Sequence, residues 1–82
     1  MPVIARFYGI VVKMYFREHG VPHFHANYGE YVGVFDLAAL KMIEGDLPVR
    51  AKRLVLVWTR RHRQEVIEMW RRQEYVQLPG LE

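Results

Sequence analysis

Three of the four histidines lie within seven residues of one another, at His19, His23 and His25. Imidazole binds metal ions, transfers protons near neutral pH and contacts phosphate. On a strand, His23 and His25 share one face, and Lys13 and Tyr15 take the matching face of the strand before it. If the aromatic side of the strand packs under the helix, the sequence predicts a polar outward face with two imidazoles, an ammonium and a phenol, and His19 at its rim. The opposite registry would bury both imidazoles.

Three roles compete for this cluster. As a zinc site, His23 and His25 would supply two ligands and His19 or Glu30 a third, because catalytic zinc usually keeps three protein ligands. In a metal-free ribonuclease, one imidazole would remove the 2′-hydroxyl proton, the other would protonate the leaving oxygen, and Lys13 would stabilise phosphate charge. In the third role, the histidines only contact a partner or fill a strand that Pro22 opens. The residues leave open whether the protein is an enzyme.

Composition narrows the class of protein. Eighty-two residues are enough for one domain, and without cysteine any metal must bind through nitrogen or oxygen. Twelve Lys and Arg against nine Asp and Glu give a net charge of +3, which suits nucleic acid or an acidic partner. The N-terminus lacks the pattern of a secretory signal, and no apolar run approaches the roughly 20 residues that span a bilayer. We expect a soluble, cytoplasmic protein without a membrane contact and without an obligatory cofactor.

The first half of the chain has the pattern of β-strands. Apolar residues alternate with others from Ile10 to Phe16, which is the period of a half-buried strand. Turn residues at Tyr8-Gly9, Gly29-Glu30 and Gly45-Asp46 separate further strand-like runs at 4–7, 23–28, 31–37 and 41–44. At Tyr8-Gly9 the alternative is a bulge within one long bent strand. Every connection is too short for a crossover helix, so we expect an antiparallel meander of four or five strands between residues 4 and 44.

The second half has the pattern of one long amphipathic helix, from about residue 49 to 74. Asp46 is a suitable N-cap, and Pro48 suits the first helical turn. Seven residues form an unbroken stripe at 100° per residue: Ala51, Leu54, Val55, Trp58, His62, Val66 and Met69. The sequence thus predicts a single α+β domain over residues 1–82, with the helix packed on one face of the sheet and a short tail after Gln77.

Two surfaces of this helix are candidate interfaces. Opposite the apolar stripe lie Arg53, Arg60, Arg63 and Arg71, which could contact nucleic-acid phosphate. The alternative is an ordinary solvated face, because Glu68 is spaced to pair with arginines one turn later. Ile67 and Trp70 lie at or beyond the edge of the stripe near the helix end, where we expect contact with a protein partner or a second copy in a homodimer.

Several segments together resemble domain-of-unknown-function family 4160. They are residues 2–10 (PVIARFYGI), Met14-Tyr15-Phe16, Pro22-His23-Phe24-His25-Ala26, Ile43-Glu44-Gly45, Leu47-Pro48, and Leu54-Val55-Leu56 with Trp58. The resemblance covers residue 2 to about residue 70. It implies a small stand-alone bacterial protein, usually encoded beside a second small protein and often suspected of belonging to a toxin–antitoxin-like pair. Some members carry a loose label of transcriptional regulator, and the resemblance assigns no catalytic residue.

The leading hypothesis is a binding component of a two-protein toxin–antitoxin-like module. It would act through contacts with the product of an adjacent gene, and with nucleic acid as a further partner. The alternatives are a small metal-independent ribonuclease that uses His23 and His25, and a zinc-binding protein that uses the histidine cluster.

Overall fold

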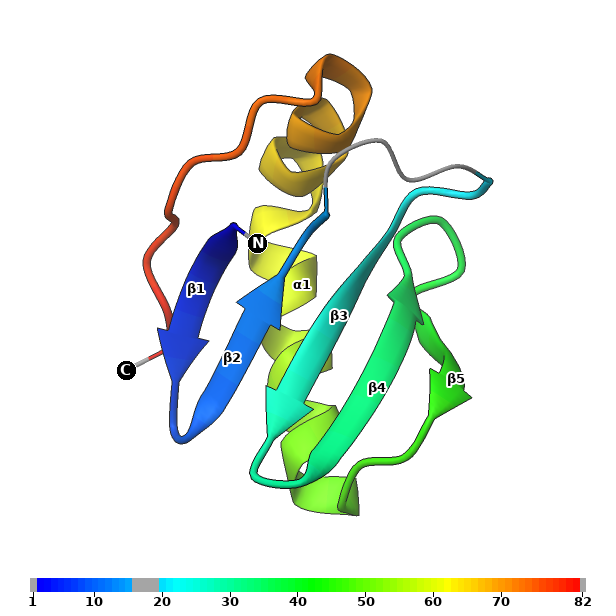
Figure 1. The fold of residues 1–82 in the computed structure, drawn as a ribbon, viewed down its shortest axis with the longest axis vertical. Helices are drawn as coiled ribbons and strands as arrows, with labels where there is room; N and C mark the ends of the chain where they lie inside the picture. Colours follow the sequence, from blue (N-terminus) through cyan, green and yellow to red (C-terminus); the bar gives the residue numbers. More distant parts are fainter. Residues whose placement is uncertain (1, 16–19, 82) are drawn as a thin grey trace.

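The fold has two layers, a five-stranded antiparallel sheet and one helix across one of its faces (Figure 1). The computed structural model describes residues 2–15 and 20–81. The strands are adjacent in chain order, so the sheet is a simple meander, and the expected α+β fold is confirmed. The elements are β1 (Val3–Phe7), β2 (Ile10–Lys13), β3 (His23–Tyr28), β4 (Tyr31–Asp36), β5 (Lys41–Gly45) and α1 (Val49–Arg72).

The strand ends follow local turn chemistry. Phe7 pairs with Ile10 across the two-residue loop Tyr8-Gly9, and both loop residues have positive φ, 49° and 81°. This is the pattern of a type I′ hairpin. The ladder of β2 ends at Lys13, whereas the alternating pattern predicted a strand to Phe16, which lies outside the described residues. Met14 leaves the strand but stays buried, and its amide donates to the carbonyl of Pro2 at 3.1 Å.

The core lies between α1 and the sheet face that carries Val12, Ala26 and Phe24. Trp58 is its centre, because its fully buried ring stacks on Phe7 and meets Phe24 edge to face, with centroids 5.8 and 6.1 Å apart. The sheet face turned away from α1, which we call the open face, carries the alternate residues. Strand periodicity thus divides each strand between the core and the open face.

The helix begins at Val49 as predicted, but its cap, its C-terminal end and its middle differ from the prediction. The residue at the N-cap position is Pro48, which provides no side-chain cap, so the prediction of Asp46 as N-cap was wrong. Asp46 lies two residues earlier, where its backbone amide donates to the Val32 carbonyl at 3.0 Å. The helix ends at Arg72 instead of residue 74. His62 has non-helical angles (φ −115°, ψ 15°), so a kink divides the helix that the sequence predicted as unbroken. Within the described part of the chain, no helix has the length and apolarity that crossing a membrane requires.

Residues 74–81 cross from the end of α1 to β1 and then run along that strand instead of forming a loose tail (Figure 1). We call them the C-terminal strap. The amide of Leu78 donates to the Ile4 carbonyl at 2.7 Å, and the indole of Trp58 donates to the Pro79 carbonyl at 2.8 Å. The strap thereby covers the edge of the sheet at β1 and connects it to the helix.

Candidate functional site

The structure brings together the four residues of the predicted polar face. Lys13 on β2 lies directly opposite His25 on β3, and both belong to the open face and are half-buried. The ring of Tyr15 meets that of His25 edge to face, with centroids 4.5 Å apart, and the His23 and His25 rings are 5.7 Å apart. His19, the predicted third member, lies outside the described residues. We call Lys13, Tyr15, His23 and His25 the histidine cluster.

The orientation of His23 is fixed by the chain just before β3. Its Nδ1 lies 2.8 Å from the carbonyl oxygen of Val21, an acceptor, so this nitrogen carries the proton. In the neutral ring the lone pair is then on Nε2, which is the arrangement that a general base or a metal ligand requires. The backbone thus selects one tautomer of His23.

The C-terminal end of α1 and the C-terminal strap both contact the histidine cluster. The last pair between β2 and β3 is Lys13 with His25, so His23 has no β2 residue beside it. Trp70 of α1 contacts the ring of His23 there, with ring centroids 4.8 Å apart. The hydroxyl of Tyr75 donates to the Tyr15 carbonyl at 2.8 Å. Residues from three distant parts of the sequence therefore set the geometry of the histidines.

The cluster has the groups for acid–base chemistry on a phosphate ester. Two imidazoles within 6 Å could serve as base and acid, and the adjacent Lys13 ammonium would stabilise negative charge. The predicted metal site depends on His19, which lies outside the described residues. Over residues 2–15 and 20–81, no group of three or more His, Asp or Glu side chains is arranged to hold a metal ion.

The predicted nucleic-acid residues fall into two groups. Arg53 and Arg60 are exposed and take part in none of the ion pairs found among the described residues. Arg71 donates from Nε and from a terminal guanidinium nitrogen to the carboxylate of Glu68, at 3.2 and 2.7 Å. Arg63 is half-buried and donates to the Ala38 carbonyl at 3.1 Å. The first two are available to a ligand, and the last two are already engaged within the fold.

The Glu68 pair shifts the titration of both partners. The hydrogen bond from Arg71, together with the charges of Arg71 and Arg72, lowers the pKa of Glu68 below its usual value, and the same contact raises the pKa of Arg71. All three side chains are largely solvent-exposed, which limits the stabilisation from such a pair. The second half of the helix is therefore internally neutralised.

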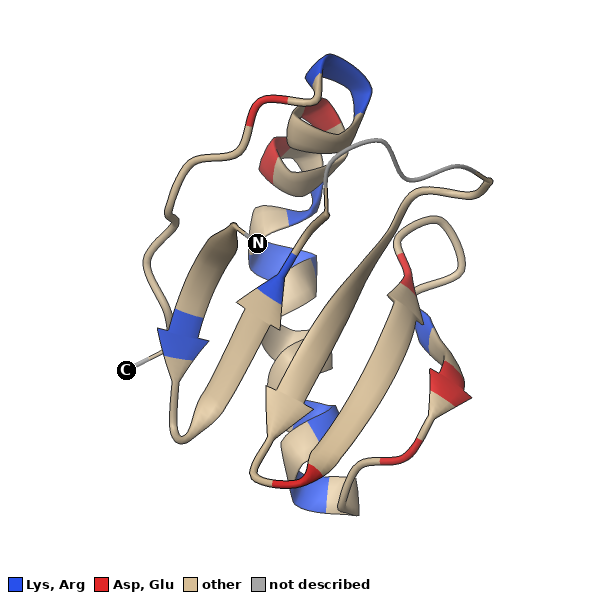
Figure 2. Ribbon diagram, viewed as in Figure 1, with Lys and Arg blue, Asp and Glu red and all other residues tan. Residues whose placement is uncertain are grey.

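The first half of the helix is not neutralised in this way (Figure 2). Residues 49–63 hold six Lys or Arg and no Asp or Glu. None of the six has an ion pair among the described residues, and Arg63 alone is engaged by a hydrogen bond, to the Ala38 carbonyl. The other five are Arg50, Lys52, Arg53, Arg60 and Arg61. Acidic side chains gather instead beside β4 and β5, at Glu30, Asp36, Glu44 and Asp46 (Figure 2). We call residues 49–63 the cationic half of α1.

The two predicted interface residues are both half-buried. Ile67 and Trp70 pack against the core, and Trp70 also covers His23. At this end of the sheet, Trp70 and the histidine cluster form one composite surface, because the Trp70 ring contacts the His23 ring.

Sequence reasoning missed one group of residues at the other end of the sheet. Tyr8, Tyr28 and Arg50 line a small notch beside the first turn of α1. The sequence carried one signal of this group: Tyr8 precedes Gly9 in a turn, at a position where Asn or Asp is usual. Nothing in the sequence indicated that this turn would meet Arg50, since 41 positions separate Gly9 from Arg50 along the chain.

Comparison with known proteins gave one match. A family model described as "Domain of unknown function (DUF4160)" matches residues 9–71. No curated protein and no solved structure matches the chain. The matched span includes the histidine cluster and the cationic half of α1.

Proposed function

This chain belongs to the DUF4160 family of unknown function, and from that premise we propose that it is a binding component of a two-protein toxin–antitoxin-like module that contacts nucleic acid through α1. The observation that carries the nucleic-acid contact is the cationic half of α1, where five exposed or half-buried cations have no ion pair among the described residues. The family resemblance supports the proposal that the chain acts together with a second protein.

Unbalanced charge on a solvated helix face has a small cost. Like charges one turn apart destabilise a helix by a few tenths of a kcal/mol, and opposite charges stabilise it by similar amounts. The second half of α1 follows this rule, since Glu65 pairs with His62, and Glu68 with Arg71 and Arg72. The first half of α1 has no acidic residue to pair with its cations, and unpaired cations are what a phosphate-binding surface needs. Arg53 and Arg60 lie about 10 Å apart along the axis, at about 1.5 Å per residue.

Binding to fluorescein-labelled RNA and DNA at several salt concentrations tests this contact. If all five cations meet phosphates, log affinity falls with log salt at a slope of about −3.5 for a single strand. In the double variant Arg53→Ala/Arg60→Ala, we expect the slope to become shallower by about 1.4. Arg71→Ala/Arg72→Ala is the matched control, because it removes the same charge from the same helix but only from side chains paired with Glu68. Equal effects of the two double variants, or no binding, would refute the contact.

The second protein of the module is tested by co-purification with the product of the adjacent gene. The proposed contact surface is the composite of Trp70, Ile67 and the histidine cluster, where several aromatic rings are in contact with one another. We expect Trp70→Ala to reduce co-purification and Arg71→Ala to leave it unchanged. A protein that stays monomeric and binds neither its neighbour nor itself would contradict this part.

A second candidate function is metal-independent RNA cleavage by the histidine cluster. It is favoured by the fixed Nδ1 proton of His23 and by the 5.7 Å between the His23 and His25 rings. His23→Ala and His25→Ala should each abolish cleavage, and His62→Ala is the control because His62 lies on α1 beside Glu65. Cleavage that survives both cluster variants would eliminate this function. Elemental analysis of protein purified without a histidine tag tests the zinc alternative.

A further inference from the structure

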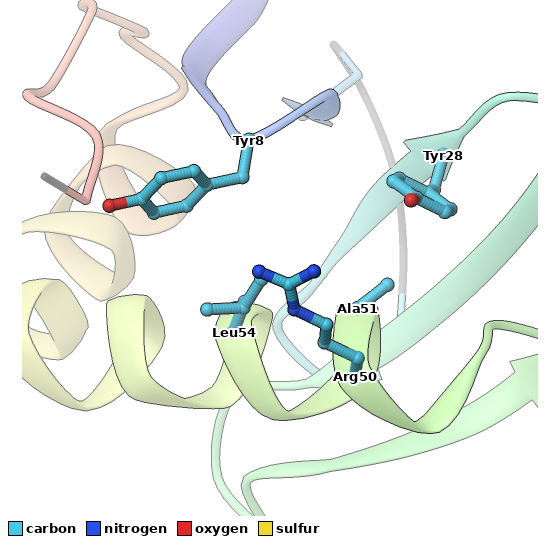
Figure 3. A pocket seen from close by; sticks show the side chains of 5 residues that line it. All are labelled: Tyr8, Tyr28, Arg50, Ala51 and Leu54. Carbon is cyan, nitrogen blue, oxygen red and sulfur yellow. The ribbon is translucent and has the colours of Figure 1, made fainter.

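Two tyrosines and an arginine surround a notch where the β1–β2 turn meets the first turn of α1 (Figure 3). Tyr8 comes from the turn, Tyr28 from the end of β3, and the Arg50 guanidinium points into the space between the two rings, while Ala51 and Leu54 form the floor. This group, which we call the tyrosine notch, continues the cationic half of α1 at its N-terminal end.

Tyr8 is an unfavourable residue for its position. Its φ is +49°, a left-handed conformation that few residues other than Gly, Asn and Asp adopt readily. A type I′ turn usually has Asn-Gly or Asp-Gly. The ring is 53% exposed, so burial does not explain why a tyrosine stands there. A strained residue with an exposed aromatic ring indicates a role outside folding.

Tyr28 is held next to Tyr8 by the glycine of the same turn. A Cβ at Gly9 would lie 3.4 Å from the Tyr28 ring, so the turn backbone packs directly against this ring. Tyr28 is 37% exposed, and its cross-strand partner Tyr31 is 40% exposed. Partly uncovered rings and the Arg50 cation therefore gather at one end of the fold.

The size of the notch excludes a buried ligand. Its volume is about 50 Å³, whereas pockets that enclose small molecules measure about 300–1,000 Å³. A ligand can therefore rest only one face on the rings, while its charge meets Arg50. Flat rings beside cations are what proteins use to stack the bases of single-stranded nucleic acid.

We propose that the tyrosine notch stacks an unpaired base of single-stranded RNA or DNA and that Arg50 contacts the phosphate next to it. This inference rests on the proposed nucleic-acid contact of α1 and specifies the form of its ligand. Duplexes are poor ligands for the notch, because their bases are already stacked on one another. Single strands gain the ring contact in addition to the phosphate contacts of α1.

Affinities of the full chain for a labelled oligouridine dodecamer and for a duplex of the same length test the inference. We expect Tyr8→Asn to weaken single-strand binding about 5- to 100-fold and to leave duplex binding unchanged, as expected for the loss of one stacked base. Because Asn suits the turn, this variant should unfold at the same or a higher urea concentration than the wild type. Tyr8→Phe keeps the ring and should keep the affinity.

Tyr28→Leu, which retains the apolar contact with Gly9, is the second variant and should show the same selective loss. Wild-type single-strand affinity in both Tyr8→Asn and Tyr28→Leu, or an equal loss for single strand and duplex, would overturn the inference while the proposed contact of α1 still holds. If the wild-type chain binds neither nucleic acid, both the inference and the proposed contact fail.

Discussion

The indole of Trp58 connects the C-terminal strap to the core, and Trp58→Phe tests how the fold is closed. The ring is fully buried, and its N–H donates to the carbonyl of Pro79 at 2.8 Å. Phenylalanine keeps a six-membered ring for the stack on Phe7 but loses the donor and the rest of the indole. The variant therefore removes one bond to the strap and leaves a void in the core.

The expected loss of stability has two parts. A neutral hydrogen bond contributes about 0.5–1.5 kcal/mol net, and Pro79 is exposed, so its carbonyl can bind water after the loss. The missing ring atoms correspond to about 1–2 kcal/mol of lost burial, at about 0.8 kcal/mol per methylene. We expect a total of about 1.5–3.5 kcal/mol, which lowers the melting temperature of a domain this small by about 6–28 °C.

Urea unfolding followed by far-UV circular dichroism measures this change, and a double-mutant cycle with Gly80→Ala isolates the strap. A Cβ at Gly80 would collide with the Arg6 carbonyl and come within 2.9 Å of the Phe7 Cβ, so this substitution displaces the strap. In that background Trp58→Phe should cost about 0.5–1.5 kcal/mol less, because the acceptor has already moved away. The same cost in both backgrounds would show that the hydrogen bond does not hold the strap.

Two further substitutions test the packing of the sheet and the charge of the helix end. Gly33→Val should lower the free energy of unfolding by about 1–3 kcal/mol in a urea titration. A Cβ at this position would lie 2.8 Å from the Met42 sulfur and 3.1 Å from a Leu47 methyl group. A variant as stable as the wild type would refute this close fit. Arg71→Ala should raise the pKa of Glu68 toward its usual value in an NMR titration, since the Arg71 hydrogen bond is the main cause of its lowering. Because the pKa of Glu68 is lowered in the folded state, its ionisation stabilises the fold at pH values above the usual pKa of a glutamate. This stabilisation is lost as the pH falls through the folded-state pKa. If Arg71→Ala leaves the pH dependence of stability unchanged, the assignment to Arg71 is wrong.

The sequence was sufficient for the element order because strands and helices carry local periodicities. Alternation from Ile10 and Tyr-Gly or Gly-Glu turns predicted the meander, and the 100° stripe through Trp58 predicted the helix and its buried face. The same periodicity placed His23, His25 and Lys13 on one face, and the register between β2 and β3 puts Lys13 directly opposite His25. Each of these features depends on residues close together in the chain.

Capping and the kink were not predictable in the same way. Asp46 looked like an N-cap, but its amide is bonded to Val32, a residue on another strand. The non-helical angles at His62 interrupt an apolar stripe that continues on both sides. The position of Asp46 depends on a hydrogen bond to a distant strand, and neither that bond nor the backbone angles at His62 follow from periodicity.

By itself, then, the sequence determined the α+β meander, the apolar face of the helix and the shared face of the histidines, since neighbouring residues set all three. Only the tertiary structure decided that Trp70 packs on His23, that the strap covers β1, and that Tyr8 and Tyr28 meet Arg50. It also separated the engaged Arg63 and Arg71 from the available Arg53 and Arg60. Those contacts join parts of the chain far apart in sequence, and packing of the helix on the sheet creates them.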